Sequence, residues 1–425
     1  MRSRAAVKGP NYTLVVLRRG AITGRVELMS SDISQVEQAD GPIRLLNLLV
    51  PVPCWEEYPS YASCVEAKSV GDPGARSEPL KTAARTPPVA TYEDAREPPA
   101  SGLKVAVAVC TRDRPQQLLS CLNRLQATIS YDIETVIVDN APVDLRTADL
   151  VDKFQASGMN IRRVVEPRPG LSNARNCALE SIDADIVAFT DDDAVVDTEW
   201  IYAIGEPFAQ DKSIALVTGM VLPARLETSA QEAFQSKMQW SEAQAAATYW
   251  RGMDPRPAWV FPYAAGHFGT GANFAVRRAE VLLLGGFNER LGAGTRTQGG
   301  EDLEMFVRVI KGGRKLAYTP TAFVWHDHRL HMAQLNQLMY GYGKGLSATV
   351  TSLLLQADKG DIKDIARATT EFLRRRCRSG VGSPSARIDL YEAAGLLVGP
   401  FAYLWEGLVQ RMSEKLPASN GIQLL

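Results

Sequence analysis

The sequence predicts an α/β protein whose main domain is a doubly wound sheet with helices on both faces. Between residues 104 and 191, short apolar runs alternate with helical segments, and the runs read KVAVAV, ETVIVD, IRRVV and DIVAFT. Because these runs lack the period-2 alternation of a half-exposed strand, they indicate buried parallel strands. Pro115 suits the first turn of a helix. Leu118, Leu122 and Leu125 then recur at helical spacing, which predicts an amphipathic helix returning over the sheet.

Composition and pattern divide the chain into four regions. Residues 1–64 form a small β-rich region, because the runs TLVVL and GRVEL flank a short turn and so predict a hairpin. Residues 65–102 contain six prolines and few branched aliphatic residues, which is typical of a linker. The α/β domain spans 103–331, and the residues from 332 to 425 are predicted to form a helical C-terminal extension.

Bulk properties exclude several classes of protein. The 425 residues carry 47 basic and 48 acidic side chains, so the chain has no overall attraction to nucleic acid. The six cysteines form no CxxC pair, which predicts reduced thiols rather than a disulfide framework or a zinc finger. No run reaches the roughly 18 to 20 apolar residues of a membrane-spanning helix. The apolar run near the N-terminus is too short for a signal peptide, so we expect a cytoplasmic protein.

Polar side chains follow the strands of the predicted sheet at the edge where doubly wound sheets bind ligands. They are Thr111 and Asp113 after the first strand, Asp139 after the second, and Asp191, Asp192 and Asp193 after the strand DIVAFT. Three adjacent carboxylates repel one another unless water or a cation neutralises them. The triplet therefore predicts a site for a hard divalent cation, with an acidic surface turn as the alternative.

The turn after the first strand excludes two common α/β classes. It reads CTRDRP and contains no glycine. A dinucleotide-binding dehydrogenase needs a glycine-rich turn here, because the pyrophosphate must approach backbone amides closely. A sugar-phosphate nucleotidyltransferase would carry a glycine-rich basic loop at the same place. Both classes are therefore disfavoured.

Three further motifs suit a phosphorylated ligand and its chemistry. In PGLSNARN, Ser172 can cap a helix whose first turn contains Arg175, and free amides with a guanidinium favour phosphate. The alternative is a capped core helix with Arg175 in solvent. The glycines of GHFGTGAN allow the backbone to approach a ligand. Glu301 and Asp302 begin a helix, where the dipole favours acidic residues in any case.

A histidine cluster follows the strand TAFVW in the segment WHDHRLH. His326 and His328 would project on one side of an extended segment, while His331 lies outside it. The pair could complete a metal shell, or both rings could lie on the surface.

The motifs together resemble the nucleotide-sugar-binding half of family 2 glycosyltransferases of the GT-A fold. The resemblance covers Lys104 to Arg329, and its elements stand in the family's order: TRDRP, VIVDN, GLSNARN, the DxD at Asp191 to Asp193, GANFAVRR and GGED. It implies a mixed GT-A sheet and an inverting transfer of a sugar from a nucleoside diphosphate to an acceptor hydroxyl. It also implies Mg²⁺ or Mn²⁺ as cofactor.

The resemblance assigns roles residue by residue. The nucleotide-binding residues would be Thr111, Asp113, Asp139, Gly170, Arg175, Asp191 and Asp192. An imide hydrogen bond to Asp139 favours a UDP-sugar, although thymine or guanine could also donate. The metal ligands would be Asp193 and Asp191 with one histidine, His328 slightly before His326. The donor-sugar or acceptor contacts would be Gly271, Ala272 and Asn273. The general base would be Asp302, with Glu301 beside it.

The C-terminal extension leaves the acceptor open. A basic cluster at residues 374–378 precedes an apolar run ending at Trp405, which suits peripheral contact with the inner face of an anionic membrane. A helical bundle packed on the catalytic domain is the alternative. The acceptor could be a glycan, a lipid-linked sugar or a small molecule. Two other functions remain: a catalytically silent protein that binds sugar nucleotides or glycans, and a nucleotidyltransferase.

Overall fold

The N-terminal region contains the predicted hairpin. In the computed structural model, the described residues are 12–18, 21–28, 44–47, 102–129, 133–238, 240, 245–253, 261–263, 265–378 and 386–415. Strands β1 (Tyr12–Arg18) and β2 (Ala21–Leu28) pair antiparallel, and β3 (Arg44–Asn47) pairs with the other edge of β1. Residues 65–101 of the predicted linker lie outside the described residues.

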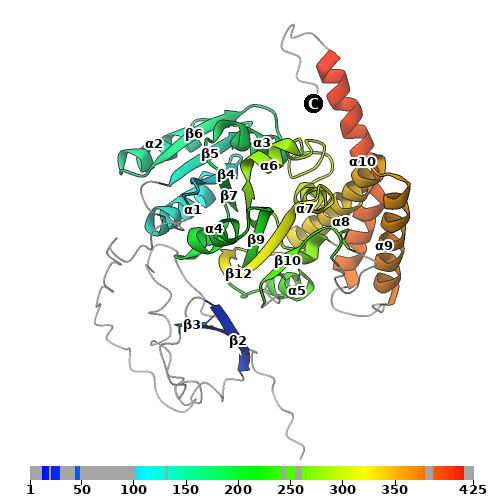
Figure 1. Cartoon of the computed structure of the whole chain (residues 1–425), viewed down its shortest axis with the longest axis horizontal. Coiled ribbons are helices and arrows are strands. Elements are labelled where there is room, and N and C mark those ends of the chain that lie inside the picture. The colour runs from blue at the N-terminus through cyan, green and yellow to red at the C-terminus, as the bar shows by residue number, and fades with distance from the viewer. Residues whose placement is uncertain are drawn as a thin grey trace, which may run out of the picture.

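The main domain is built on a nine-stranded mixed sheet (Figure 1). Its strands are β4 (Val105–Thr111), β5 (Glu134–Asn140), β6 (Ile161–Glu166), β7 (Ile186–Asp191), β8 (Ala194–Val196), β9 (Ile214–Pro223), β10 (Ala247–Tyr249), β11 (Asn273–Arg277) and β12 (Lys315–His326). The order is β10-β12-β9-β11-β7-β4-β5-β6, and β8 pairs with β12. Strands β4 to β7 are parallel, whereas β11 runs antiparallel to both of its neighbours.

Helices cover both faces of this sheet, as predicted. They are α1 (Pro115–Thr128), α2 (Arg146–Ala156), α3 (Leu171–Ser181), α4 (Trp200–Gln210), α5 (Ser229–Met238), α6 (Arg278–Leu283) and α7 (Glu301–Lys311). In β4, Val107 packs in one core cluster with α1 and α4, and Ala108 packs in the other with α3 and α7. Both faces of the strand are therefore buried, which explains why its sequence is continuously apolar.

The C-terminal extension is a helical bundle beside the sheet (Figure 1). It consists of α8 (Met332–Leu355), α9 (Lys359–Arg378) and α10 (Ala386–Lys415). Helices α8 and α10 lie so close together that a Cβ at Gly343 would be 2.0 Å from the carbonyl oxygen of Glu392. Glycine at this position therefore permits the contact. The hydroxyl of Tyr403 on α10 accepts a hydrogen bond from Asn288 at 3.1 Å and so ties the bundle to the domain. Within the described part of the chain, no helix has the length and apolarity needed to span a bilayer.

Candidate active site

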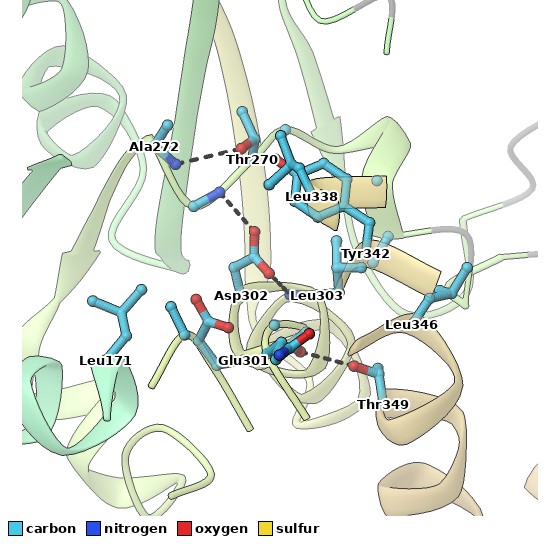
Figure 2. A pocket seen from close by; sticks show the side chains of 18 of the residues that line it. Leu171, Thr270, Ala272, Glu301, Asp302, Leu303, Leu338, Tyr342, Leu346 and Thr349 are labelled. Atoms are coloured by element: carbon cyan, nitrogen blue, oxygen red, sulfur yellow. Dashed lines mark hydrogen bonds between the residues drawn. The ribbon is translucent and has the colours of Figure 1, made fainter. Parts of the chain in front are cut away.

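A cavity of about 1370 Å³ opens at the carboxyl ends of β4 and β7. It is lined by the acidic triplet and by the start of α7, and it continues along α8, α9 and α10. In Figure 2, Asp302 lies between the loop of Thr270 and Ala272 and the α8 side chains of Leu338 and Tyr342. The fold therefore brings residues from distant parts of the sequence to one space.

Arg114 holds two carboxylates of the triplet. Its Nη1 donates to Asp192 at 2.6 Å and its Nη2 donates to Asp193 at 2.7 Å. The hydroxyl of Thr111 donates to the second oxygen of Asp192 at 2.7 Å. Asp192 is 3% exposed, so its carboxylate depends on these partners within the protein rather than on water. Asp191, by contrast, has a side chain that is 34% exposed and faces the cavity.

The three carboxylates titrate differently because their surroundings differ. Burial raises the pKa of Asp191, and the neighbouring Asp193 raises it further. Burial raises the pKa of Asp192 to about 6, against the opposing effect of Arg114. For Asp193 burial acts in the same sense, but the attraction of His326 and Arg114 is stronger and its pKa lies below the ordinary value. Asp193 is therefore the carboxylate most firmly held in its charged form.

His326 lies beside Asp193, and His328 lies next to His326. Strand β12 pairs with β8 so that His326 is opposite Ala194, which places its Nε2 at 3.6 Å from Asp193 Oδ1. The Nδ1 atoms of the two rings are 3.1 Å apart. His328 is 3% exposed, and its Nε2 lies 3.1 Å from Gln235 Oε1. Of the two histidines, His326 is the one that faces the acidic triplet.

Arg175 is buried and connects the two walls of the cavity. Its Nη1 donates to Glu301 at 2.9 Å, and its Nη2 donates to the carbonyl of Gly271 at 2.9 Å. The same Nη2 lies 3.9 Å from Asp191 Oδ1. The guanidinium also stacks over Phe274. Two of the nitrogens of Arg175 thus bind protein groups, although the side chain also lines the cavity.

The start of α3 differs from the prediction in its cap. Gly170, with φ of 135°, is the N-cap residue, and Ser172 is the second residue of the helix. The Ser172 hydroxyl donates to the carbonyl of Leu291 at 2.7 Å and makes no cap. The amide of Gly170 donates to Asn140 Oδ1 at 2.8 Å. The glycine is needed here because this positive φ is unfavourable for residues with a side chain.

Asp302 is oriented by two backbone amides. Its Oδ2 accepts a hydrogen bond from the amide of Gly271 at 2.7 Å, and its Oδ1 accepts one from Leu303 at 2.8 Å (Figure 2). The preceding Glu301 is 5% exposed and pairs with Arg175. Burial raises the pKa of Glu301 to about 7, with Asp302 as the next cause and Arg175 opposing it. Asp302 therefore faces the cavity with a fixed carboxylate, while Glu301 lies in the protein interior.

The nucleoside residues predicted from sequence lie around the end of β5. Asp139 is fully buried and accepts hydrogen bonds from Arg163 through Oδ2 at 2.8 Å. Its Oδ1 has no hydrogen-bond partner within the described residues. Asp113 accepts a hydrogen bond from the amide of Val143 at 3.1 Å. Thr111 lines the cavity directly.

The predicted donor-sugar residues separate into two groups. Gly271 and Ala272 line the cavity. Asn273 instead points into the sheet, where its amide donates to the carbonyls of Met220 at 2.8 Å and Ala322 at 2.9 Å. Its Oδ1 accepts a hydrogen bond from Trp200 at 2.8 Å. These contacts make Asn273 a residue that holds β9, β11 and β12 together.

Two arginines of the cavity were not singled out from sequence. Arg114 stands in the TRDRP motif, but its residue type alone does not show that it spans Asp192 and Asp193. Arg329 is exposed and lines the cavity near the triplet. Its position directly after His328 in the sequence was the one available signal.

Comparison with known sequences identifies the domain. Residues 106–278 match the sequence model of Glycosyl transferase family 2. The chain contains a family 2 glycosyltransferase domain. This domain comprises β4 to β11, and its mixed sheet agrees with the GT-A class predicted from the motifs.

Known proteins resemble the glycosyltransferase domain at moderate identity. A pre-mycofactocin glycosyltransferase of Mycobacterium tuberculosis is 26% identical over 185 residues, which is 43% of this chain and 35% of that protein. The chain thus spans about a third of that relative's length. The succinoglycan biosynthesis protein ExoM of Rhizobium meliloti is 27% identical over 257 residues, 58% of this chain and 75% of ExoM.

Among solved structures, a mannosyltransferase of Pyrobaculum calidifontis in complex with GDP-mannose and Mn²⁺ aligns with a TM-score of 0.45 and 17% identity. The alignment covers 76% of this chain and 91% of the mannosyltransferase.

Proposed function

We propose that this chain transfers a sugar from a nucleoside-diphosphate sugar to an acceptor hydroxyl with inversion, using a divalent cation and Asp302 as the general base. One observation carries the proposal. The acidic triplet and Asp302 line the same cavity, and Arg175 with Gly271 connects them. A leaving diphosphate and an attacking hydroxyl need groups of this kind on two sides of one reacting carbon.

Asp193 and His326 would hold Mn²⁺ or Mg²⁺, with Asp191 on the same edge. In the described residues, no group of three or more His, Cys, Asp or Glu side chains is spaced to hold a metal ion. A pair of side chains is sufficient for such a site, because these cations usually complete their shell with water and substrate phosphates. The 3.6 Å between Asp193 Oδ1 and His326 Nε2 suits two ligands of one ion. A bound cation neutralises charge on the departing diphosphate.

The protein's own cations would assist at the diphosphate. Arg329 lies exposed at the cavity and is near enough to Asp193 to lower its pKa, although less than His326 does. Charge-assisted hydrogen bonds from a guanidinium to phosphate are strong and directional. Of the predicted nucleotide contacts, Asp139 is fully buried and is not among the residues that line the cavity, but its Oδ1 lacks a hydrogen-bond partner among the described residues and would accept the imide hydrogen of uracil from a base seated at the end of β5. This favours a UDP-sugar as donor.

Asp302 would accept the proton of the acceptor hydroxyl. As the hydroxyl oxygen forms its bond to the anomeric carbon, the bond from that carbon to the diphosphate breaks on the opposite side, and the hydroxyl proton passes to the carboxylate. The two amides that bind Asp302 fix the direction of its carboxylate. Glu301 would position Arg175 and thereby Gly271.

Nucleotide binding and transfer can be tested separately. UDP with Mn²⁺ should raise the melting temperature of the protein, and Asp193→Ala should remove the shift. Asp302→Asn should keep the shift but lose metal-dependent hydrolysis or transfer across a panel of UDP-, GDP- and dTDP-sugars. Asp183→Asn is the control, because Asp183 is fully exposed in the loop before β7, at the other end of that strand from the triplet.

The outcomes distinguish this proposal from its alternatives. One contact favours the alternative function, binding of sugar nucleotides without reaction: Arg114 forms ion pairs with both Asp192 and Asp193. Such a protein would show the melting shift, with no turnover of any donor. A nucleotidyltransferase would release pyrophosphate from a nucleoside triphosphate and a sugar phosphate. Absence of a shift with every nucleoside diphosphate would overturn the proposal.

A further inference from the structure

The cavity that contains Asp302 continues as an apolar space between the C-terminal helices. On α8, Leu338, Tyr342, Leu346, Val350 and Leu354 line it, each four residues after the last. Residues four apart are neighbours on a helix surface, so these side chains form one continuous row. Figure 2 shows the start of this row beside Asp302, with Leu338, Tyr342 and Leu346 following one another along α8.

The opposite walls of this space are also apolar. Ile365 and Phe372 on α9 and Leu396 and Leu397 on α10 line the same cavity. We call the part of the cavity between α8, α9 and α10 the apolar arm. It begins near the proposed base and ends among residues that the sequence placed outside the glycosyltransferase domain.

The polar side chains in the apolar arm are largely engaged within the protein. The hydroxyl of Thr349 donates to the carbonyl of Gly300 at 2.9 Å, and that of Thr351 donates to the carbonyl of Ser347 at 2.8 Å. Lys237 and Glu392 pair at 2.9 Å and so compensate each other's charge. A glycan in this space would require hydrogen bonds that few wall residues can offer, whereas a hydrocarbon chain requires none.

The apolar arm reaches an exposed apolar surface on α10. Leu397 lines the cavity and has 76% of its surface exposed. It continues into a row of exposed side chains on the same helix, which contains Phe401, Leu404, Leu408 and Met412. These residues recur three or four positions apart, so they share one face of the helix. A chain leaving the arm would therefore pass from one apolar environment to another.

We infer that the acceptor is amphipathic: its hydroxyl reaches Asp302 while a hydrocarbon chain lies in the apolar arm. The inference rests on the proposed function, and it assigns the acceptor to lipids among the classes that the sequence left open. The exposed row of α10 is the face through which such a chain would enter from a lipid surface.

Binding can be tested with a defined probe. The probe is dodecanol with a photoreactive diazirine at mid-chain, and the labelled peptides of the full chain are located by mass spectrometry. Labelling should fall on 338–354 of α8, 365–372 of α9 and 396–397 of α10. Unlabelled octanol, decanol and dodecanol should compete with affinities that rise about fourfold for each added methylene, as expected for full burial.

Two matched pairs of variants locate the chain. Leu354 and Leu355 are adjacent and exposed on α8, but only Leu354 lines the cavity. Leu354→Lys should weaken probe binding by about 15-fold, the effect of leaving roughly two methylene groups in water, and Leu355→Lys should not. On α10, Leu397→Lys should act like Leu354→Lys, with Leu404→Lys as its control. All four substitutions add a charge at an exposed site, so none of them buries a charge.

UDP binding with Mn²⁺ is measured on the same samples. Labelling in the apolar arm, with the expected variant effects, supports the inference. Labelling confined to 401–412, or equal effects of the paired variants, overturns the inference about the acceptor. If the same samples show the UDP shift, the glycosyltransferase proposal stands. Absence of labelling in a protein that shows the UDP shift likewise overturns the inference. If neither UDP nor the probe binds, the proposed function fails and the inference fails with it.

Discussion

Replacing Gly271 by alanine tests whether the backbone of this residue sets the position of Asp302. A Cβ at residue 271 would lie 2.9 Å from Asp302 Oδ2 and 3.1 Å from Arg175 Nη2. Both distances are shorter than ordinary contacts, so Asp302 must move by several tenths of an ångström. Its hydrogen bond from the Gly271 amide, now 2.7 Å, would lengthen or break. Gly271 is not among the residues with positive φ, so the backbone itself tolerates alanine.

The magnitudes follow from that displacement. A lost hydrogen bond to a charged group reduces the free energy of unfolding by about 1.5 to 3 kcal/mol. A displaced base should lower kcat by up to about 100-fold, since a misplacement of roughly 1 Å has an effect of that size. Affinity for UDP with Mn²⁺ should be unchanged, because the atoms nearest to the added Cβ belong to Asp302 and Arg175 and not to the acidic triplet.

The assay compares Gly271→Ala with Gly266→Ala, whose Cβ would meet no atom within 4 Å. Metal-dependent donor hydrolysis gives kcat, urea denaturation gives the free energy of unfolding, and titration gives UDP affinity. Unchanged kcat in a folded Gly271→Ala protein would refute the role of this amide. An equal loss of kcat and UDP affinity would refute the separation of the two walls.

Three further predictions concern buried polar groups. The pKa of Glu301 is raised to about 7, so between pH 4.5 and pH 7 the folded protein holds a proton that the unfolded chain has lost. The free energy of unfolding therefore falls as pH rises through this range, by about 1.4 kcal/mol per pH unit at most. Urea denaturation at pH 5 and pH 7 should show that Glu301→Gln removes this fall. Asn273→Leu leaves Trp200 Nε1 and two carbonyls without partners and should destabilise by about 3 to 5 kcal/mol, without changing UDP affinity of the folded fraction. Cys121 on α1 is 1% exposed and its burial raises the pKa of its thiol, so mass spectrometry should find it alkylated by iodoacetamide at pH 8 only after unfolding.

The sequence predicts those elements whose pattern is local. Helix α1 and strands β4 and β5 match their predicted spans within a few residues. Burial of one helix stripe leaves a helical period in the sequence, and burial of both faces of a strand leaves a continuous apolar run. The edge that carries Thr111 and the acidic triplet follows from the same information, since parallel strands end together.

Contacts between distant residues left no such trace. Ser172 has a residue type typical of an N-cap, yet its hydroxyl binds Leu291, which is 119 residues away. Asn273 stands in a glycine-rich loop motif, but the irregular pairing of β9 with β12 leaves the carbonyls of Met220 and Ala322 for its amide. Whether a polar side chain binds a ligand or the protein depends on these distant partners, which spacing does not show.

Arg175 explains how the two halves of the site keep a fixed separation. Displacement at a sugar carbon requires the base and the leaving group to be held on opposite sides of one atom. Here Asp191 ends β7, whereas Asp302 is the second residue of α7, and more than a hundred residues separate them. The buried guanidinium contacts Glu301 and Gly271 and lies within 3.9 Å of Asp191. A shift of either wall would therefore break a charged hydrogen bond in the interior, where its loss has the greatest effect on stability. The residue predicted from sequence to bind phosphate is thus the one that links the end of β7 to the start of α7.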